Sequence, residues 1–328
     1  MSEIHKFLFD GLPVRGVLVR LTGAWTEVLK RRASGSGGAY PEPVQNMLGE
    51  LVAAATLMQS NIKFNGSLIL QIFGDGPVKL AVAEIQPDFG LRATATVIGD
   101  IEKQSNLSAL VNVGNEGKCA ITLDPKTRFP GQQPYQGVVP LFGDDGKPLE
   151  KLSEVLEHYM LQSEQLDTRL VLAADGQVAA GLLIQRLPLE GVGNLAGSLM
   201  SEANENEIGL NEHFNRIALL ASTLKREEIL TLDVDTILRR LFWEEQVIRF
   251  APAVGDAAPH FSCTCSRERV SNMLRGLGRP EADSILAERG NIEVGCEFCG
   301  VQYHFDPIDV AQIFAAGSGV PPSTDLVQ

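Results

Sequence analysis

Hydrophobic positions in residues 1–188 follow two periods, one typical of strands and one typical of helices. Val17, Val19 and Leu21 alternate with their neighbours, which predicts a β-strand. Between residues 41 and 59 apolar side chains recur at spacings of three and four, which predicts a helix with one face toward a core. The same spacing predicts another helix over residues 148–162.

Turn residues divide two further pairs of apolar runs in this region. Gly74-Asp75-Gly76-Pro77 divides one pair, and Asp175-Gly176 divides the other. Apolar runs around such turns predict β-hairpins. Because hairpins dominate and strands do not alternate regularly with helices, the predicted fold class is α+β with largely antiparallel sheets. Residues 1–188 are the predicted N-terminal mixed domain.

Helical signals replace strand signals over residues 189–250, which we interpret as a helical linker. Asp235 is the expected N-cap of its last helix. Gly191-Val-Gly193-Asn-Leu-Ala196 imitates a dinucleotide-binding fingerprint, but Pro188 interrupts it, so we interpret it as an interdomain turn. Two apolar helix faces are predicted in the linker: Phe214, Ile217, Leu220 and Leu224, then Ile237, Leu238, Leu241 and Phe242.

A small C-terminal domain is predicted over residues 251–328. Val270, Met273, Leu274 and Leu277 indicate one short helix, and residues 280–289 indicate another. The alternating run 301–305 predicts a strand, and Asp306-Pro307 predicts the start of a last helix. The tail from Pro321 is expected to be frayed.

Length and charge narrow the class of protein. A chain of 328 residues is expected to form two domains with room for a short third element. Its net charge is −13, and its basic residues do not gather beyond Lys30-Arg31-Arg32, which argues against nucleic acid as a partner. No apolar run approaches the ~18–20 residues of a membrane span, so no membrane partner is expected. The polar start lacks the pattern of a secretory signal, which predicts a cytoplasmic protein.

Four of the five cysteines form two tight pairs. Cys263 and Cys265 have one residue between them, and after thirty residues Cys296 and Cys299 follow with two residues between them. Zinc prefers four such thiolates at tetrahedral corners, about 2.3 Å from the ion. We therefore predict one Zn²⁺ bound by these four residues, with an iron–sulfur cluster as the main alternative. The fifth, Cys119, is expected to be a small buried apolar residue.

The same cysteines support two interpretations, a purely structural zinc ribbon and a redox switch. A disulfide between Cys263 and Cys265 would close a very small ring, which is expected to be strained and readily reduced. Structural zinc contributes about 10–16 kcal/mol of apparent folding free energy, so oxidised ligands would destabilise a small domain. His260 and His304 lie near the pairs but are not needed as ligands. Arg267 and Arg269 either offset part of the thiolate charge or are ordinary surface residues.

No nucleophile motif or pair of catalytic carboxylates can be identified, and we predict that the chain is not an enzyme. At its cysteines the chain resembles the redox-regulated heat-shock chaperones of 33 kilodaltons, a family of zinc-dependent bacterial holdases. The segments similar to that family's motifs run over nearly the whole chain: 49–55, 63–66, 74–78, 162–165, 181–185, 263–269, 284–288 and 296–300.

The resemblance implies an N-terminal α+β domain, a helical linker and a C-terminal zinc domain. It implies a protein that binds unfolding client proteins without ATP after oxidation and heat, favours a homodimer when oxidised and releases zinc. The oxidised pairs it implies are Cys263–Cys265 and Cys296–Cys299. The alternative is a zinc-ribbon protein that binds nucleic acid or serves as a structural interaction module without a redox switch.

Overall fold

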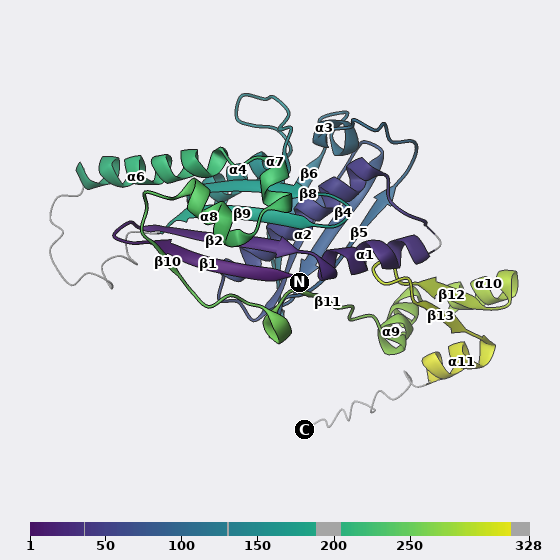
Figure 1. The fold of residues 1–328 in the computed structure, drawn as a ribbon. Helices are drawn as coiled ribbons and strands as arrows, with labels where there is room; N and C mark the ends of the chain where they lie inside the picture. The colour runs from purple at the N-terminus through teal and green to yellow at the C-terminus, as the bar shows by residue number, and fades with distance from the viewer. Residues whose placement is uncertain (36, 130, 188–204, 316–328) are drawn as a thin grey trace, which may run out of the picture. The chain divides into compact units, whose positions relative to one another are not determined.

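Two β-sheets and a helix that packs on both form the core of the N-terminal part (Figure 1). The computed structural model describes residues 1–35, 37–129, 131–187 and 205–315. The predicted turn at 191–196 and the predicted frayed tail lie outside the described residues. The chain separates into two units, Met1–Ser262 and Cys263–Gln328.

The first unit holds a five-stranded sheet of order β10-β1-β2-β9-β8 and a six-stranded sheet of order β11-β5-β4-β3-β6-β7. Neighbouring strands are antiparallel except β11 and β5, which are parallel, so the predicted α+β class with largely antiparallel sheets is confirmed. The strands are β1 (Glu3–Phe9), β2 (Val14–Leu21), β3 (Gly66–Phe73), β4 (Val78–Ile85), β5 (Gly90–Val97), β6 (Lys118–Pro125), β7 (Tyr135–Pro140), β8 (Thr168–Ala174), β9 (Ala179–Arg186), β10 (Val247–Arg249) and β11 (His260–Phe261).

Helix α2 is the centre of the larger core, because its residues contact strands of both sheets. Leu48, Leu51 and Val52 on this helix are fully buried, as its apolar spacing predicts. The predicted hairpins are confirmed as β3–β4 and β8–β9. The helices of the first unit are α1 (Gly23–Ser34), α2 (Glu42–Asn61), α3 (Leu107–Val111), α4 (Leu152–Glu164), α6 (Glu205–Ser222), α7 (Arg226–Thr231), α8 (Val234–Leu241) and the short 3-10 helix η1 (Gly255–Ala257).

The predicted linker helices lie on the face of the five-stranded sheet opposite α2 (Figure 1). Phe214, Ile217 and Phe242 are buried there against residues of β1, β2 and β9, which explains their apolar spacing. Two details differ from the expectation. Leu224 is buried but follows the end of α6, and Asp233, rather than Asp235, caps α8 by accepting a hydrogen bond from the backbone of Thr236.

Residues 251–262, which the sequence pattern assigned to the C-terminal domain, belong to the first unit. The strands β10 and β11 hold this segment, since they pair with β1 and β5. Strands of three and two residues are too short to show a hydrophobic period, so the sequence did not indicate them. The division into residues 1–188, 189–250 and 251–328 stays a prediction.

The second unit contains α9 (Arg267–Leu277), α10 (Arg279–Arg289), a hairpin of β12 (Ile292–Gly295) and β13 (Gln302–Phe305), and α11 (Pro307–Ala315). Met273 and Leu277 are about half exposed, so the buried face of α9 is narrower than predicted. The buried residues that form the core of the second unit are Val270, Leu274, Ala282, Ile292, Phe305, Val310 and Ile313. Such a small apolar core contributes little stability by itself.

Candidate metal centre

The first cysteine pair lies in the short connection between β11 and α9. Ser266 follows at once and caps α9, because its hydroxyl accepts a hydrogen bond from the backbone N–H of Arg269 at 3.2 Å. The cap starts the helix directly after Cys265. Cys263 and Cys265 thus lie on a short irregular segment whose end is fixed by the first turn of a helix.

The second pair lies in the turn of the β12–β13 hairpin. The backbone N–H of Cys296 donates to the carbonyl of Val301 at 2.9 Å, and that of Gly300 donates to the carbonyl of Cys296 at 2.8 Å. Gly300 has a φ of 74°, a left-handed conformation that favours glycine. This tight turn lets Cys296 and Cys299 present their sulfur atoms on the same side.

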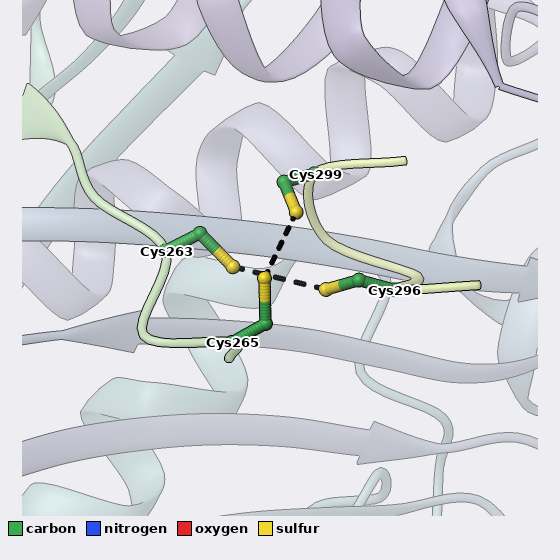
Figure 2. Close-up of side chains that lie close together, drawn as sticks. All are labelled: Cys263, Cys265, Cys296 and Cys299. Carbon is green, nitrogen blue, oxygen red and sulfur yellow. Dashed lines mark hydrogen bonds between the residues drawn. The ribbon is translucent and has the colours of Figure 1, made fainter. Parts of the chain in front are cut away.

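The four sulfur atoms point toward one another (Figure 2). All lie within 4.8 Å of one another, with Cys263 to Cys296 at 3.7 Å and Cys265 to Cys299 at 3.2 Å. A tetrahedral ion with sulfur ligands at about 2.3 Å needs sulfur atoms roughly 3.8 Å apart. The residues present therefore fit one metal ion, and none of the four is in a disulfide.

Three of these thiols, Cys263, Cys265 and Cys299, have shifted pKa values. Burial opposes the thiolate of Cys265, but the hydroxyl of Tyr303 and the neighbouring thiols donate hydrogen bonds to its sulfur and lower its pKa to about 7. Burial, followed by hydrogen bonding to Cys265, raises the pKa of Cys299. Burial also raises the pKa of Cys263. Cys265 is thus more readily deprotonated than Cys263 or Cys299, for metal binding or for attack on an oxidant.

Tyr303 is a residue that the sequence pattern did not single out. Its hydroxyl donates to the sulfur of Cys265 at 3.2 Å, and this hydrogen bond raises the pKa of Tyr303 to about 12. A hydrogen bond to a ligating sulfur helps to orient it and stabilises its charged form. The only available signal was the place of Tyr303 in the alternating run that follows the second cysteine pair.

The charged residues near the cysteines have partners of their own. Arg267 forms an ion pair with Asp309 at 2.7 Å, and its guanidinium lies 4.3 Å from the ring centre of Phe305. Arg269 donates to the hydroxyl of Thr264. His304 lies 3.4 Å from a carboxylate oxygen of Glu293. Among the described residues, the group that could hold a metal ion consists of cysteines alone.

Cys119 lies far along the chain from the other cysteines, on β6. It is fully buried in the larger core, and burial raises the pKa of its thiol to about 12. The prediction of a small buried apolar residue is confirmed. It also makes Cys119 a suitable control for the other four.

Metal analysis of single substitutions tests the ligand set. Cys263→Ser, Cys265→Ser, Cys296→Ser and Cys299→Ser should each lower the zinc bound to the reduced chain by tenfold or more at limiting metal, because an alcohol is a poor zinc ligand. Cys119→Ser should keep one zinc per chain. Loss of zinc from Cys119→Ser, or full affinity in Cys296→Ser, would contradict the assignment.

The fold and the site define a class of protein: a large α+β unit followed by a small unit whose four cysteines can hold a metal ion. The family model described as Hsp33 protein matches residues 2–306. The chain belongs to this family of chaperones, which confirms both the resemblance and the prediction that it is not an enzyme.

Individual relatives agree with the family. The chain is 46% identical over 313 residues to a 33 kDa chaperonin of Chromobacterium violaceum, covering 95% of this chain and 94% of the relative. It is 41% identical to a 33 kDa chaperonin of Shewanella woodyi, covering 96% of each chain. The crystal structure of the 33 kDa chaperonin from Thermotoga maritima shares the fold, with a TM-score of 0.70 at 19% identity over 97% of this chain and 99% of that one.

No helix in the described part of the chain is long and apolar enough to cross a membrane.

Proposed function

We propose that this chaperone is a redox-regulated, ATP-independent holdase of the cytoplasm that binds unfolding client proteins. The observation that carries the proposal is the cluster of four thiols in a unit with a small apolar core. In the reduced state one Zn²⁺ would bind Cys263, Cys265, Cys296 and Cys299 and stabilise that unit. The metal supplies no reaction here, since its effect is on folding.

Oxidation would remove the ligands. Each disulfide forms when two thiols lose two electrons and two protons, and one hydrogen peroxide accepts them to give two waters. The proposed pairs are Cys263–Cys265 and Cys296–Cys299, although sulfur contacts at 3.7 and 3.2 Å also join Cys263 to Cys296 and Cys265 to Cys299. Only one or two residues separate the cysteines of each proposed pair, so each disulfide needs only a local rearrangement of the backbone. Disulfide sulfur is a poor zinc ligand, so zinc would leave and the unit would unfold.

The surface that oxidation would expose is the one the linker helices cover. Phe214, Ile217 and Phe242 pack on the five-stranded sheet and are no more than 7% exposed. Cys263 directly follows the last residue of the first unit, so unfolding beyond it would weaken the attachment of the segment before it. Apolar surface of a few hundred Å² is enough to bind an unfolding chain or a second copy, which would favour a homodimer.

Light scattering of a heat-unfolding enzyme tests the proposal. Peroxide-treated protein should suppress aggregation without ATP, and reduced zinc-loaded protein should suppress it poorly. Zinc content and free thiols measured on the same samples should fall by one ion and four thiols per chain. Equal suppression by both forms would leave a chaperone without a switch, and suppression by neither would favour a structural zinc ribbon.

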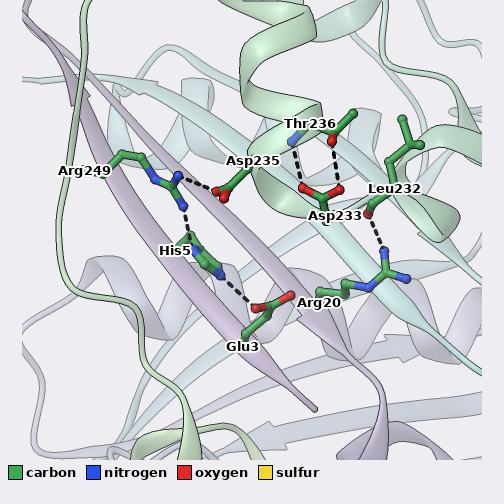
Figure 3. Close-up of polar contacts among 8 residues, drawn as sticks. All are labelled: Glu3, His5, Arg20, Leu232, Asp233, Asp235, Thr236 and Arg249. Atoms are coloured by element: carbon green, nitrogen blue, oxygen red, sulfur yellow. Dashed lines mark hydrogen bonds and ion pairs between the residues drawn. The ribbon is translucent and has the colours of Figure 1, made fainter.

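Polar contacts fix the linker as well as apolar ones (Figure 3). The guanidinium of Arg20, on β2, donates to the carbonyls of Ile229 at 3.1 Å, Leu230 at 2.7 Å and Leu232 at 2.9 Å. These carbonyls are at the end of α7, where the helix itself supplies no donors. A cation at a helix C-terminus is also favourable because of the helix dipole. Arg20 therefore attaches α7 to the sheet.

Arg20→Ala should loosen α7 and α8 while leaving the sheets folded. Hydrogen bonds from a charged donor contribute about 1.5–3 kcal/mol, so we expect a loss of roughly 2–3 kcal/mol in local stability. Hydrogen exchange of α7 should become at least tenfold faster. The control is Arg186→Ala, which removes a partly exposed ion pair between Arg186, on β9, and Asp167. This substitution should change the hydrogen exchange of α7 little. Unchanged exchange in α7 of Arg20→Ala would show that apolar packing alone holds the helix.

A further inference from the structure

The segment of residues 246–262, here called the edge strap, runs along one edge of each sheet. Through β10 it pairs antiparallel with β1, and through β11 it pairs parallel with β5. In the described part of the chain no other strand borders these two edges. The strap therefore covers backbone groups of β1 and β5 that would otherwise be unpaired, and such edges readily accept another strand.

The backbone bonds along β1 change register once, between Phe250 and Ala253. Along this edge, the backbone N–H of Phe250 donates to the carbonyl of Lys6 at 3.0 Å, and that of Asp10 donates to the carbonyl of Gln246 at 2.8 Å. Ile4 and Ala253 exchange both of their hydrogen bonds, at 3.2 and 2.9 Å. An extended segment of about eight residues thus fits this edge.

Backbone hydrogen bonds also hold the strap on β5, and the chain then leads into the metal centre. The backbone N–H of His260 donates to the carbonyl of Phe89 at 3.2 Å, and that of Ser262 donates to the carbonyl of Leu91 at 2.9 Å. Ser262 is followed directly by Cys263. Loss of order in the second unit therefore begins one residue beyond the last bond of the strap.

Three large apolar side chains of the strap are about half exposed. Ile248, Phe250 and Val254 are 47%, 51% and 46% exposed. A segment with few buried side chains opens at a lower free energy than the strands it covers. The strap is thus the part of the first unit that can leave while β1 and β5, which lie inside the cores, stay folded.

One side chain fixes the strap to both the sheet and the linker (Figure 3). Arg249, on β10, donates to Nδ1 of His5 on β1 at 3.1 Å and forms an ion pair with Asp235 of α8. The other ring nitrogen of His5 lies 2.9 Å from a carboxylate oxygen of Glu3. Arg249 therefore couples the position of the strap to that of the linker helices.

We propose that the edges of β1 and β5, once the strap leaves, bind client proteins by strand addition. The occupant is an extended apolar segment of an unfolding polypeptide, because the strap that occupies the edges now is itself such a segment. Backbone hydrogen bonds provide affinity without a fixed sequence, which a chaperone of many clients needs. The side chains of the added strand would take the places of Val247 and Phe261, which pack on the two cores. The inference rests on the proposed function and adds the way in which the client binds.

Synthetic peptides with the sequence of residues 246–253 test strand addition to the full-length protein. In an antiparallel pair alternate N–H groups face the partner, so the N–H of Phe250 faces β1 and that of Arg249 faces away. A fluorescent peptide should bind oxidised protein and bind reduced protein at least tenfold more weakly. N-methylation at Phe250 should weaken binding to the oxidised form about tenfold or more, and N-methylation at Arg249 should leave it nearly unchanged.

A pair of variants tests the opening step in reduced protein. Arg249→Ala should raise peptide binding severalfold without oxidation, whereas Arg239→Ala, at an exposed position of the neighbouring helix, should not. No binding of the unmethylated peptide to oxidised protein, or equal binding of both methylated peptides, would overturn the proposal. Suppression of client aggregation, measured on the same samples, separates this failure from failure of the proposed function, since a holdase that binds clients elsewhere would still suppress aggregation.

Discussion

Chelation of zinc from the reduced protein should unfold the second unit and leave the first one folded. The second unit has a small apolar core, whereas the first buries a long helix between two sheets. The metal would contribute about 10–16 kcal/mol of apparent folding free energy to a unit that has little other stability. Hydrogen exchange should show that amides from Cys263 onward lose protection, while those of α2 and the strands around it keep theirs.

Cys119→Ser is the matched control for this experiment, because Cys119 is buried in the first unit. Its exchange before and after chelation should match that of the parent chain. Cys296→Ser should resemble the chelated parent without any chelator. Retained protection in α9 and in the β12–β13 hairpin after complete removal of zinc would show that the small core is sufficient, and the switch would then need another cause.

Phe242→Ala should release the linker without oxidation. The ring of Phe242 is 2% exposed and lies 4.9 Å from the ring of Phe9 and 6.2 Å from that of Phe7, centre to centre. Replacing such a buried ring by a methyl group costs about 3–5 kcal/mol. This loss of stability weakens the packing of the linker on β1. Reduced Phe242→Ala should therefore suppress aggregation of a heat-unfolding enzyme nearly as well as the oxidised parent does.

The next residue supplies the control. Trp243 is 74% exposed, so Trp243→Ala removes a larger side chain from the same segment but almost no packing. Its reduced form should suppress aggregation as poorly as the parent does, and its thermal unfolding should be nearly unchanged. Activation of both variants to the same extent would mean that aromatic packing of the linker on β1 does not hold the chaperone inactive.

Local features of the sequence determined much of this protein. The hairpins at residues 74–77 and 175–176 follow from turn residues between apolar runs, and α2 follows from its apolar spacing. The cysteine cluster was predictable because only one or two residues separate the members of each pair, so that local backbone geometry brings its sulfur atoms together. Family motifs along the chain indicated the class of protein, which its relatives confirm.

Only the tertiary structure decided the contacts that hold the linker and the edge strap. His5 and Arg249 are 244 positions apart, and Arg20 is 212 positions from Leu232. Strands as short as β10 and β11 are defined by the backbone of their partners, not by their own side chains, so no hydrophobic period marks them. Tyr303 reaches Cys265 because a hairpin and a helix cap place them together across 38 positions. Contacts of this kind depend on how distant segments of the chain pack together. The sequence around one residue of such a pair does not indicate which distant residue it will contact.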